Sequence, residues 1–475
     1  MRRTYSLAAS VALLLLGQHA GLTAQNLLVH GGTVVTSEGS FEADVLVRAG
    51  VIAAVGRDLN AESGVRRIDA SGLLVLPGGV DPHVHLGGRW VDDYRTGSMA
   101  ALAGGITTIS NFASAGRGSD LTEVIDRQAA LIAQQAIADV ILHTTINDPE
   151  AHAPQMGALA ATGQTSIKIF MNFGGFDPNA SAFLQMIAAA GDAGVLTMIH
   201  AEDASILANQ AAELEAQGRT SVAYQPEARP ALAEEVAMMR AVAMAEQTGS
   251  PVYAVHVSSE RALRVAQAAR ARGLPFFIET RPIYLHLTRE RFDGPDAGLY
   301  VGQPPLREQS DQDALWEALA NGTIDVVGTD HVAYSREDKL DPSQTITNHR
   351  AGMNHLQMLR PLLFSDGVLA GRISVERFVE VTATNPAKLF GIFPEKGTIA
   401  VGSDADLVLW DPEETRTVRD QDMFSATGFS IYAGWEVTGW PVVTLRRGEV
   451  VFEGGEITGQ AGTGRLLERS RWEER

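Results

Sequence analysis

The central part of the chain, from about residue 74 to residue 390, alternates between short apolar runs rich in β-branched residues and longer alanine-rich stretches. The short runs are typical of buried strands and the longer stretches of helices. Helices such as 121–138, 231–247 and 260–272 separate the strands. The predicted strands are 74–84, 107–111, 140–145, 166–171, 195–200, 252–257, 275–279 and 323–330.

This order of elements predicts an α/β fold with parallel strands, because parallel neighbours need a long crossover connection that a helix provides. Eight strand–helix units favour a (β/α)8 barrel of the TIM type, which we assign to residues 76–391. A doubly wound open sheet is the alternative, since hydrophobic periodicity does not distinguish the two. The alanine-rich, acidic segment 203–230 is predicted to be an insertion between the fifth and sixth strands.

Both ends of the chain have a different texture. Residues 25–75 and 392–460 contain short alternating runs punctuated by glycine, a pattern that predicts antiparallel strands and turns. We expect these two segments to form one small composite β-sandwich domain. Residues 461–475 are predicted to be a charged tail that becomes ordered only on an oligomer surface.

Residues 1–24 have the pattern of a signal peptide. Arg2 and Arg3 precede an apolar run that is too short to span a bilayer, and small residues follow as far as Ala24. We expect cleavage after Ala24 and a periplasmic or secreted protein with no membrane attachment afterwards. An uncleaved anchor is the alternative.

Composition excludes several classes of function. The 475 residues include 38 Lys and Arg against 57 Asp and Glu, so the formal net charge is −19, and the cations form no dense run. Nucleic acid is therefore not an expected partner, because phosphate binding depends on clustered cations. Cysteine is absent, which excludes disulfides, thiolate metal sites and cysteine nucleophiles. Any metal must be held by nitrogen and oxygen ligands.

Ionisable residues occur at the carboxyl ends of the predicted strands, where a barrel builds its active site. His83 and His85 are two residues apart on one strand, so both imidazoles can point to the same face. A lysine within an apolar strand is costly to bury in its charged form, and the structural alternative is a salt bridge to a nearby carboxylate. The candidate residues at strand ends are His83, His85, Lys168, His200, His256 and Asp330.

The type and order of these residues resemble the binuclear metal site of the amidohydrolase superfamily, in its dihydropyrimidinase and hydantoinase branch. The resemblance covers nearly the whole chain after residue 24. Joint occurrence of several separate motifs makes it specific. The segments that carry it are 77–86, 93–108, 279–285, 304–307 and 396–412.

The resemblance implies a ligand set for two divalent ions. His83, His85 and Asp330 would hold one ion, and His200 and His256 would hold the second. Lys168, carboxylated by carbon dioxide, would bridge the two ions, which explains a lysine in a buried strand. Zinc is the expected metal for imidazole and oxygen ligands, and manganese or cobalt could replace it.

The resemblance also implies a reaction. A hydroxide between the ions would attack the carbonyl carbon of a small cyclic amide or imide, and Asp330 would act as general base and then general acid. A second possibility is an acyclic amide, such as an N-acyl amino acid or a dipeptide. A third is a non-catalytic scaffold, because the branch includes binding proteins that lost the ligands. A homo-oligomer, tetrameric by resemblance, is expected.

Some positions depart from the branch. Phe173 stands where dihydropyrimidinases carry a tyrosine that stabilises the oxyanion, so the ions alone, a neighbour such as Asn172, or a different substrate must compensate, unless Phe173 is simply a packing residue. Gln303 replaces an expected serine, and Asn354 is the candidate backbone position for reading a cyclic imide. Dihydroorotase activity is disfavoured, because Gly87 stands where those enzymes have an arginine.

Overall fold

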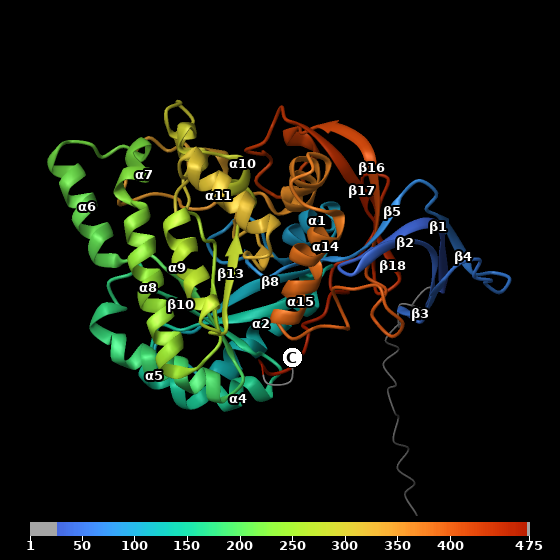
Figure 1. The fold of residues 1–475 in the computed structure, drawn as a ribbon, viewed down its shortest axis with the longest axis horizontal. Coiled ribbons are helices and arrows are strands. Elements are labelled where there is room, and N and C mark those ends of the chain that lie inside the picture. The colour runs from blue at the N-terminus through green and yellow to red at the C-terminus, as the bar shows by residue number, and fades with distance from the viewer. Residues whose placement is uncertain (1–25, 473–475) are drawn as a thin grey trace, which may run out of the picture.

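Eight parallel strands form the centre of the molecule (Figure 1). The computed structural model describes residues 26–472, and in it each strand pairs with its neighbour in chain order from β6 to β14. The strands are β6 (Gly79–Asp81), β8 (Ile106–Ser114), β9 (Asp139–Thr145), β10 (Ser166–Phe170), β11 (Leu196–His200), β12 (Val252–Ala254), β13 (Phe276–Thr280) and β14 (Val326–Val327).

Short extensions of the first and last strands close this sheet into a barrel. β7 (Val84–His85) pairs in parallel with β15 (His331–Val332). Just before this pair, Thr329 donates a hydrogen bond from its backbone N–H and another from its hydroxyl to the buried Asp81 carboxylate, at 3.1 and 2.6 Å. The predicted (β/α)8 barrel is therefore confirmed, and the open-sheet alternative is wrong.

Helices connect the barrel strands and cover their outer face (Figure 1). The predicted helices 121–138, 231–247 and 260–272 correspond to α2, α8 and α9, and the insertion 203–230 contains α6 and α7. The helices are α1 (Tyr94–Ala103), α2 (Leu121–Gln135), α3 (Pro149–His152), α4 (Met156–Ala161), α5 (Ala180–Asp192), α6 (Ala204–Ala216), α7 (Gln225–Ala228), α8 (Ala231–Thr248), α9 (Glu260–Ala271), α10 (Pro282–His286), α11 (Gln309–Ala320), α12 (Arg336–Lys339), α13 (Leu359–Leu363), α14 (Val375–Val379) and α15 (Asn385–Leu389).

The two ends of the chain pair in a second sheet beside the barrel (Figure 1). Its strand order is β19-β18-β17-β16-β5-β1-β2-β3, with β4 also paired to β1, and the antiparallel pair β5–β16 joins the two chain ends. Its strands are β1 (Leu27–Thr36), β2 (Gly39–Arg48), β3 (Val51–Gly56), β4 (Arg66–Asp69), β5 (Leu74–Pro77), β16 (Leu407–Thr417), β17 (Glu436–Arg446), β18 (Glu449–Glu453) and β19 (Glu456–Ile457).

This region differs from the sequence prediction in two respects, the direction of some strands and the extent of the first barrel strand. β1 pairs in parallel with β4 and β5, so the sheet is mixed. The predicted first barrel strand, 74–84, is divided at Gly78, because β5 belongs to the mixed sheet and β6 to the barrel. A β-carbon at Gly78 would lie 2.1 Å from the Thr107 hydroxyl oxygen, so only glycine lets the chain pass from one sheet to the other here.

The C-terminal segment packs against the barrel. The N–H of Leu467 donates to the Val140 carbonyl at 2.8 Å, and the Arg465 carbonyl accepts from the Val140 N–H at 2.8 Å. Arg469 is buried and donates to the Ser166 hydroxyl at 2.8 Å. The expectation that this tail orders only on an oligomer surface is therefore wrong for residues 461–472, because the segment satisfies backbone groups of β9 within the same chain.

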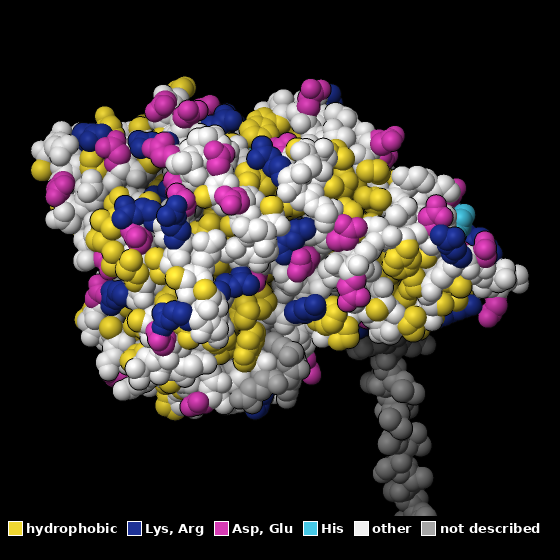
Figure 2. Space-filling model, viewed as in Figure 1, with side chains coloured by type: hydrophobic (Ala, Val, Ile, Leu, Met, Phe, Trp, Pro, Cys, Tyr) yellow, Lys and Arg dark blue, Asp and Glu magenta, His cyan; other side chains and the backbone are white. Residues whose placement is uncertain are grey.

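The face of the molecule in Figure 2 carries acidic and basic side chains side by side, without a field of one sign. This mixture agrees with charges that are spread along the sequence. Within residues 26–472, no helix has both the length and the apolar character needed to cross a membrane. The predicted signal peptide lies outside the described residues.

A buried ionic cluster ties the barrel to the mixed sheet. The Lys396 ammonium lies 2.7 Å from Asp139, which begins β9, and 2.8 and 2.9 Å from Asp404 and Asp406, which precede β16. Burial alone would lower the pKa of Lys396, but the three carboxylates more than offset it and raise the pKa above the usual lysine value. One lysine thus compensates acids from both parts of the fold.

We expect the variant Lys396→Met to lower the free energy of unfolding by about 3–5 kcal/mol, because it leaves buried carboxylates without their cation. Lys388→Met, at an exposed position, is the matched control and should change stability by less than about 1 kcal/mol. Equilibrium unfolding in urea measures both. Equal stability of the two variants would show that the cluster contributes nothing specific.

Candidate metal centre

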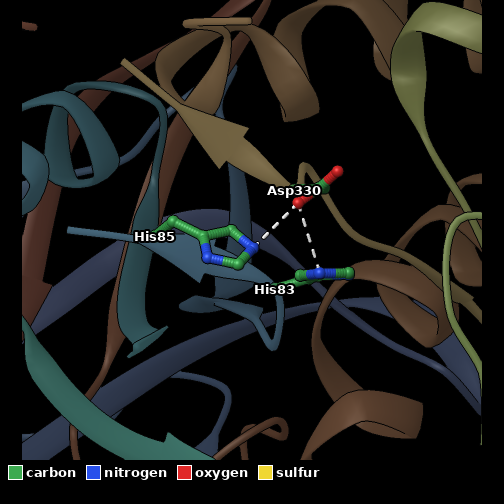
Figure 3. Close-up of side chains that lie close together, drawn as sticks. All are labelled: His83, His85 and Asp330. Carbon is green, nitrogen blue, oxygen red and sulfur yellow. Dashed lines mark ion pairs between the residues drawn. The ribbon is translucent and has the colours of Figure 1, made fainter. Parts of the chain in front are cut away.

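His83, His85 and Asp330 converge at the point where the barrel closes (Figure 3). His83 lies between β6 and β7, His85 in β7, and Asp330 between β14 and β15. The Nε2 atoms of His83 and His85 are 3.3 and 3.0 Å from Asp330 Oδ1. One ligand atom from each residue lies within 4.8 Å of the others, so the three side chains could hold one metal ion.

Arg281 fixes the other side of the Asp330 carboxylate. Its Nη1 lies 3.1 Å from Asp330 Oδ2, and its Nε donates to the Thr329 carbonyl at 2.8 Å. Burial alone would raise the pKa of Asp330, but Arg281 and the two imidazoles more than offset it and hold the pKa well below the usual range. Asp330 is therefore an anion with one oxygen directed at the histidines.

The remaining predicted ligands lie beside this group. The ring centres of His200 and His256 are 4.5 Å apart, and those of His83 and His256 are 5.5 Å apart. A single cavity of about 310 Å³ is lined by all of the predicted metal-binding residues. The barrel therefore brings together, from five of its strands, the residues that the sequence predicts, namely His83, His85, Lys168, His200, His256 and Asp330.

Lys168 is buried without a partner. Its side chain is fully buried in β10, and its Nζ makes no hydrogen bond with residues 26–472. The Nζ lies 5.5 and 5.2 Å from the ring centres of Phe112 and Phe170. Burial lowers the pKa of Lys168 to about 7, against the opposing influence of Asp330 and Glu279. A large fraction of this amine is therefore uncharged near neutral pH, in the form that can react with carbon dioxide.

Two backbone positions in the site have an unusual conformation. His256 and Asp330 have φ values of 43° and 50°, in the left-handed region that side chains with a β-carbon seldom occupy. Strained backbone of this kind persists where the surrounding structure holds a side chain in a required direction. Here both strained residues turn their side chains into the same cavity.

Buried carboxylates orient the histidines from behind. His83 Nδ1 lies 2.6 Å from Glu279 Oε1, and the same carboxylate accepts from the Tyr253 hydroxyl at 2.8 Å and from the His256 N–H at 2.9 Å. Burial lowers the pKa of His83 well below its usual value, so the ring is neutral. With Nδ1–H directed at Glu279, the Nε2 lone pair of His83 faces Asp330 and the cavity.

His200 has an equivalent arrangement. Its Nε2 lies 2.8 Å from Glu202, a buried carboxylate that also pairs with Arg229. Burial lowers the pKa of His200 as well, so its ring is neutral and Nδ1 is left for a ligand. The sequence analysis did not assign a role to Glu202 or Glu279. The available signal for Glu279 was a carboxylate at the end of the seventh strand, but its partner could not be read from spacing.

The predicted substrate-contacting residues differ in their positions. Phe173 lies on the cavity wall with 57% of its surface exposed. Gln303 also lines the cavity and accepts from the Asn172 amide at 3.4 Å. Asn354 is not a lining residue, and its amide donates to the hydroxyl of Thr427 at 2.6 Å. The substrate roles assigned to Phe173, Gln303 and Asn354 stay predictions.

Comparison with known proteins supports the same class of site. Residues 74–451 match the amidohydrolase family. A D-hydantoinase from Ralstonia pickettii is 35% identical over 462 residues, which cover 94% of this chain and 100% of the relative. The solved structure of D-hydantoinase from Bacillus sp. AR9 has a TM-score of 0.90 at 36% identity. The match covers 94% of this chain and 99% of the Bacillus chain. The solved structure of L-hydantoinase (dihydropyrimidinase) from Arthrobacter aurescens has a TM-score of 0.87 at 31% identity. The match covers 94% of this chain and 100% of the Arthrobacter chain.

This chain therefore belongs to the amidohydrolase family. Its relatives and structural neighbours place it in the hydantoinase branch of that family and show that it is an enzyme. The resemblance that the strand-end residues and motifs indicate is confirmed.

We expect Glu279→Gln to weaken metal binding by about 10- to 100-fold, because a neutral amide orients and polarises the His83 ring less well than a carboxylate. Binding is measured by competition with a chelator at fixed pH. Glu456→Gln, on the exposed edge strand β19, serves as control. Unchanged affinity in a folded Glu279→Gln protein would show that the contact with His83 does not support the metal centre.

Proposed function

We propose that this enzyme hydrolyses a C–N bond of a cyclic amide or imide in a metal-dependent reaction. The observation that carries the proposal is the single cavity in which every residue of the predicted ligand set meets. The names of the relatives, D-hydantoinase and L-hydantoinase, support a cyclic amide as substrate. A cavity of about 310 Å³ has the size of a small-molecule site.

The donor set fits two divalent ions. His83, His85 and Asp330 would hold one, His200 and His256 the other, and a carboxyl group on Lys168 would bridge them. The unpartnered Nζ of Lys168 supports this assignment, since a buried amine without a partner is otherwise costly. Zinc suits imidazole and oxygen ligands. When bound, such ions lower the pKa of water and polarise a carbonyl group.

Asp330 is suited to move the proton. It is held as an anion by Arg281, and its Oδ1 faces the cavity between His83 and His85. We propose that Asp330 accepts the proton of the attacking water and then delivers it to the leaving nitrogen. Arg281 acts as a positioning residue. Its contact with Asp330 keeps the carboxyl group oriented while Asp330 accepts and releases the proton.

Two other functions use the same fold. An acyclic amide could be bound by the same residues, and the identity of the substrate separates it from a cyclic one. A non-catalytic scaffold is disfavoured, because the complete ligand set is present and is oriented by buried carboxylates. A panel of hydantoins, dihydrouracil, N-acyl amino acids and dipeptides, tested with the metal-loaded enzyme, distinguishes these functions.

We expect Asp330→Asn to lower the rate of hydrolysis by about 10²- to 10⁴-fold, because the amide cannot accept the proton.

Lys168→Ala should remain folded and lose bound metal, measured by elemental analysis, together with activity. Asp192→Asn, exposed at the end of α5, is the control. A folded wild-type protein that neither binds metal nor hydrolyses any cyclic amide would overturn the proposal, and full activity in Asp330→Asn would overturn the role of this residue.

We further propose that residues 1–24 direct export to the periplasm or beyond. The support is the order of Arg2 and Arg3, an apolar run and small residues as far as Ala24. Expression of the full chain in a Gram-negative host should give a periplasmic protein whose N-terminal residue is Gln25. A variant in which Leu14 and Leu15 are replaced by Asp should remain in the cytoplasm. Cytoplasmic wild-type protein with an intact N-terminus would contradict the proposal.

A further inference from the structure

The cavity that holds the metal ligands also contains a cation without a counter-charge. Arg89 is one of its lining residues, and its side chain is exposed. Within residues 26–472, Arg89 takes part in no ion pair or hydrogen bond through its guanidinium, whereas Arg281 pairs with Asp330 and Arg229 with Glu202. Arg89 is therefore free to bind a ligand.

The turn that carries Arg89 is tethered. Gly87 and Gly88 have φ values of 74° and 65°, and the N–H of Gly87 donates to the Asp92 carbonyl at 2.7 Å. The N–H of Val91 donates to the Ala333 carbonyl at 2.9 Å, which fastens the turn to the segment after β15. The position of Arg89 is thus set by the same strands that carry the metal ligands.

Trp90 connects Arg89 to the metal centre. The Arg89 guanidinium carbon lies 5.4 Å from the centre of the Trp90 ring, and that ring meets His85 edge-on at 5.1 Å between centres. A guanidinium that stacks on an aromatic face loses little freedom when it then binds an anion. The Trp90 ring is thus the one side chain between Arg89 and the predicted metal ligand His85 along this path.

The rest of the wall does not compete for this cation. Asp330 is the one carboxylate among the lining residues in the described part of the chain, and its two oxygens are directed at the histidines and at Arg281. The lining side chains that carry a hydroxyl or amide group are neutral, namely Ser114, Thr145, Asn147, Asn172 and Gln303. The exposed part of the wall that carries Arg89 is consequently suited to an anion that does not itself bind the metal ions.

We propose that Arg89 binds a carboxylate on the exocyclic substituent of the substrate, so that the substrate class is an acidic cyclic ureide or imide. This inference rests on the proposed hydrolase function and specifies its substrate. The reacting ring would lie at the metal centre while the carboxylate pairs with the planar guanidinium, a geometry that favours two parallel hydrogen bonds. Water adds to the ring carbonyl carbon, the C–N bond breaks, and the released nitrogen takes up the proton.

The test compares two substrates of nearly equal size. They are 5-(2-carboxyethyl)hydantoin and its neutral carboxamide, 5-(2-carbamoylethyl)hydantoin, and the metal-loaded enzyme is assayed with both. We expect kcat/KM to be at least about tenfold higher for the acid, because only the carboxylate is an anion whose two oxygens can both accept hydrogen bonds from the guanidinium. The preference should decrease as ionic strength rises.

Variants then assign the preference to one residue. Arg89→Gln should remove the preference for the acid, so that kcat/KM for the acid falls to about the value for the carboxamide. Arg89→Lys should retain part of it. Arg95→Gln, exposed on α1 and outside the cavity lining, should retain all of it.

The outcomes separate this inference from the proposed function. Equal kcat/KM for the two hydantoins in the wild type, or an acid preference that persists in Arg89→Gln, would overturn the role of Arg89 and leave the hydrolase function intact. Hydrolysis of neither compound, nor of unsubstituted hydantoin, by metal-loaded enzyme would overturn the proposed function itself.

Discussion

The contact between the first and last barrel strands is the constraint on which the metal centre depends. β7 and β15 pair so that Val84 is opposite His331 and His85 opposite Val332. The Asp81–Thr329 hydrogen bonds fix this register one step deeper in the barrel. Because a shift of one residue would turn every side chain to the other face, this register is what brings Asp330 to His83 and His85.

Burial favours the neutral form of every ionisable group gathered at this closure. For the imidazoles and for Lys168, it removes water and lowers the pKa, so these groups are held in the neutral form that a metal or carbon dioxide requires. For Asp330, the cation of Arg281 overcomes the same effect and maintains a carboxylate. Neutral nitrogen ligands and anionic oxygen ligands therefore coexist in one cavity because only the acid has a buried cation as partner.

The sequence was sufficient to predict the barrel and the group of residues that meets in its cavity. Strand ends are recognisable from apolar runs, and the predicted ligands other than Lys168 stand at or near such an end, as His200 and Asp330 illustrate. The partners of the ligands were not predictable in the same way. The contact of Glu279 with His83 joins residues that are 196 positions apart, and it depends on the side-chain packing of two strands that are not neighbours in the chain.

Errors in the sequence analysis arose where one segment serves two structures. Residues 74–84 form a continuous apolar run, yet Gly78 divides it between two sheets because its lack of a side chain allows the crossing. The tail after residue 460 is rich in charge, so it was expected to become ordered only on an oligomer surface. Arg469 is instead buried, because its guanidinium reaches the Ser166 hydroxyl on β10, the strand that carries Lys168. Composition describes a segment alone, whereas burial depends on the surface that it meets.

Chemistry and substrate choice are carried by different parts of this fold. The predicted metal ligands stand on or beside the barrel strands, so their positions depend on the strand register that barrel closure fixes. Arg89 and Phe173 stand on connections beyond the strand ends, where a substitution changes the wall of the cavity and leaves the register intact. In the proposed function, the reaction class follows from the residues at the barrel's strand ends, and the preferred substrate follows from the turn that holds Arg89. A short tethered turn with one unpaired cation selects by charge, whereas an apolar wall would select by shape, and this difference makes the exocyclic group of the substrate the part that this particular chain reads.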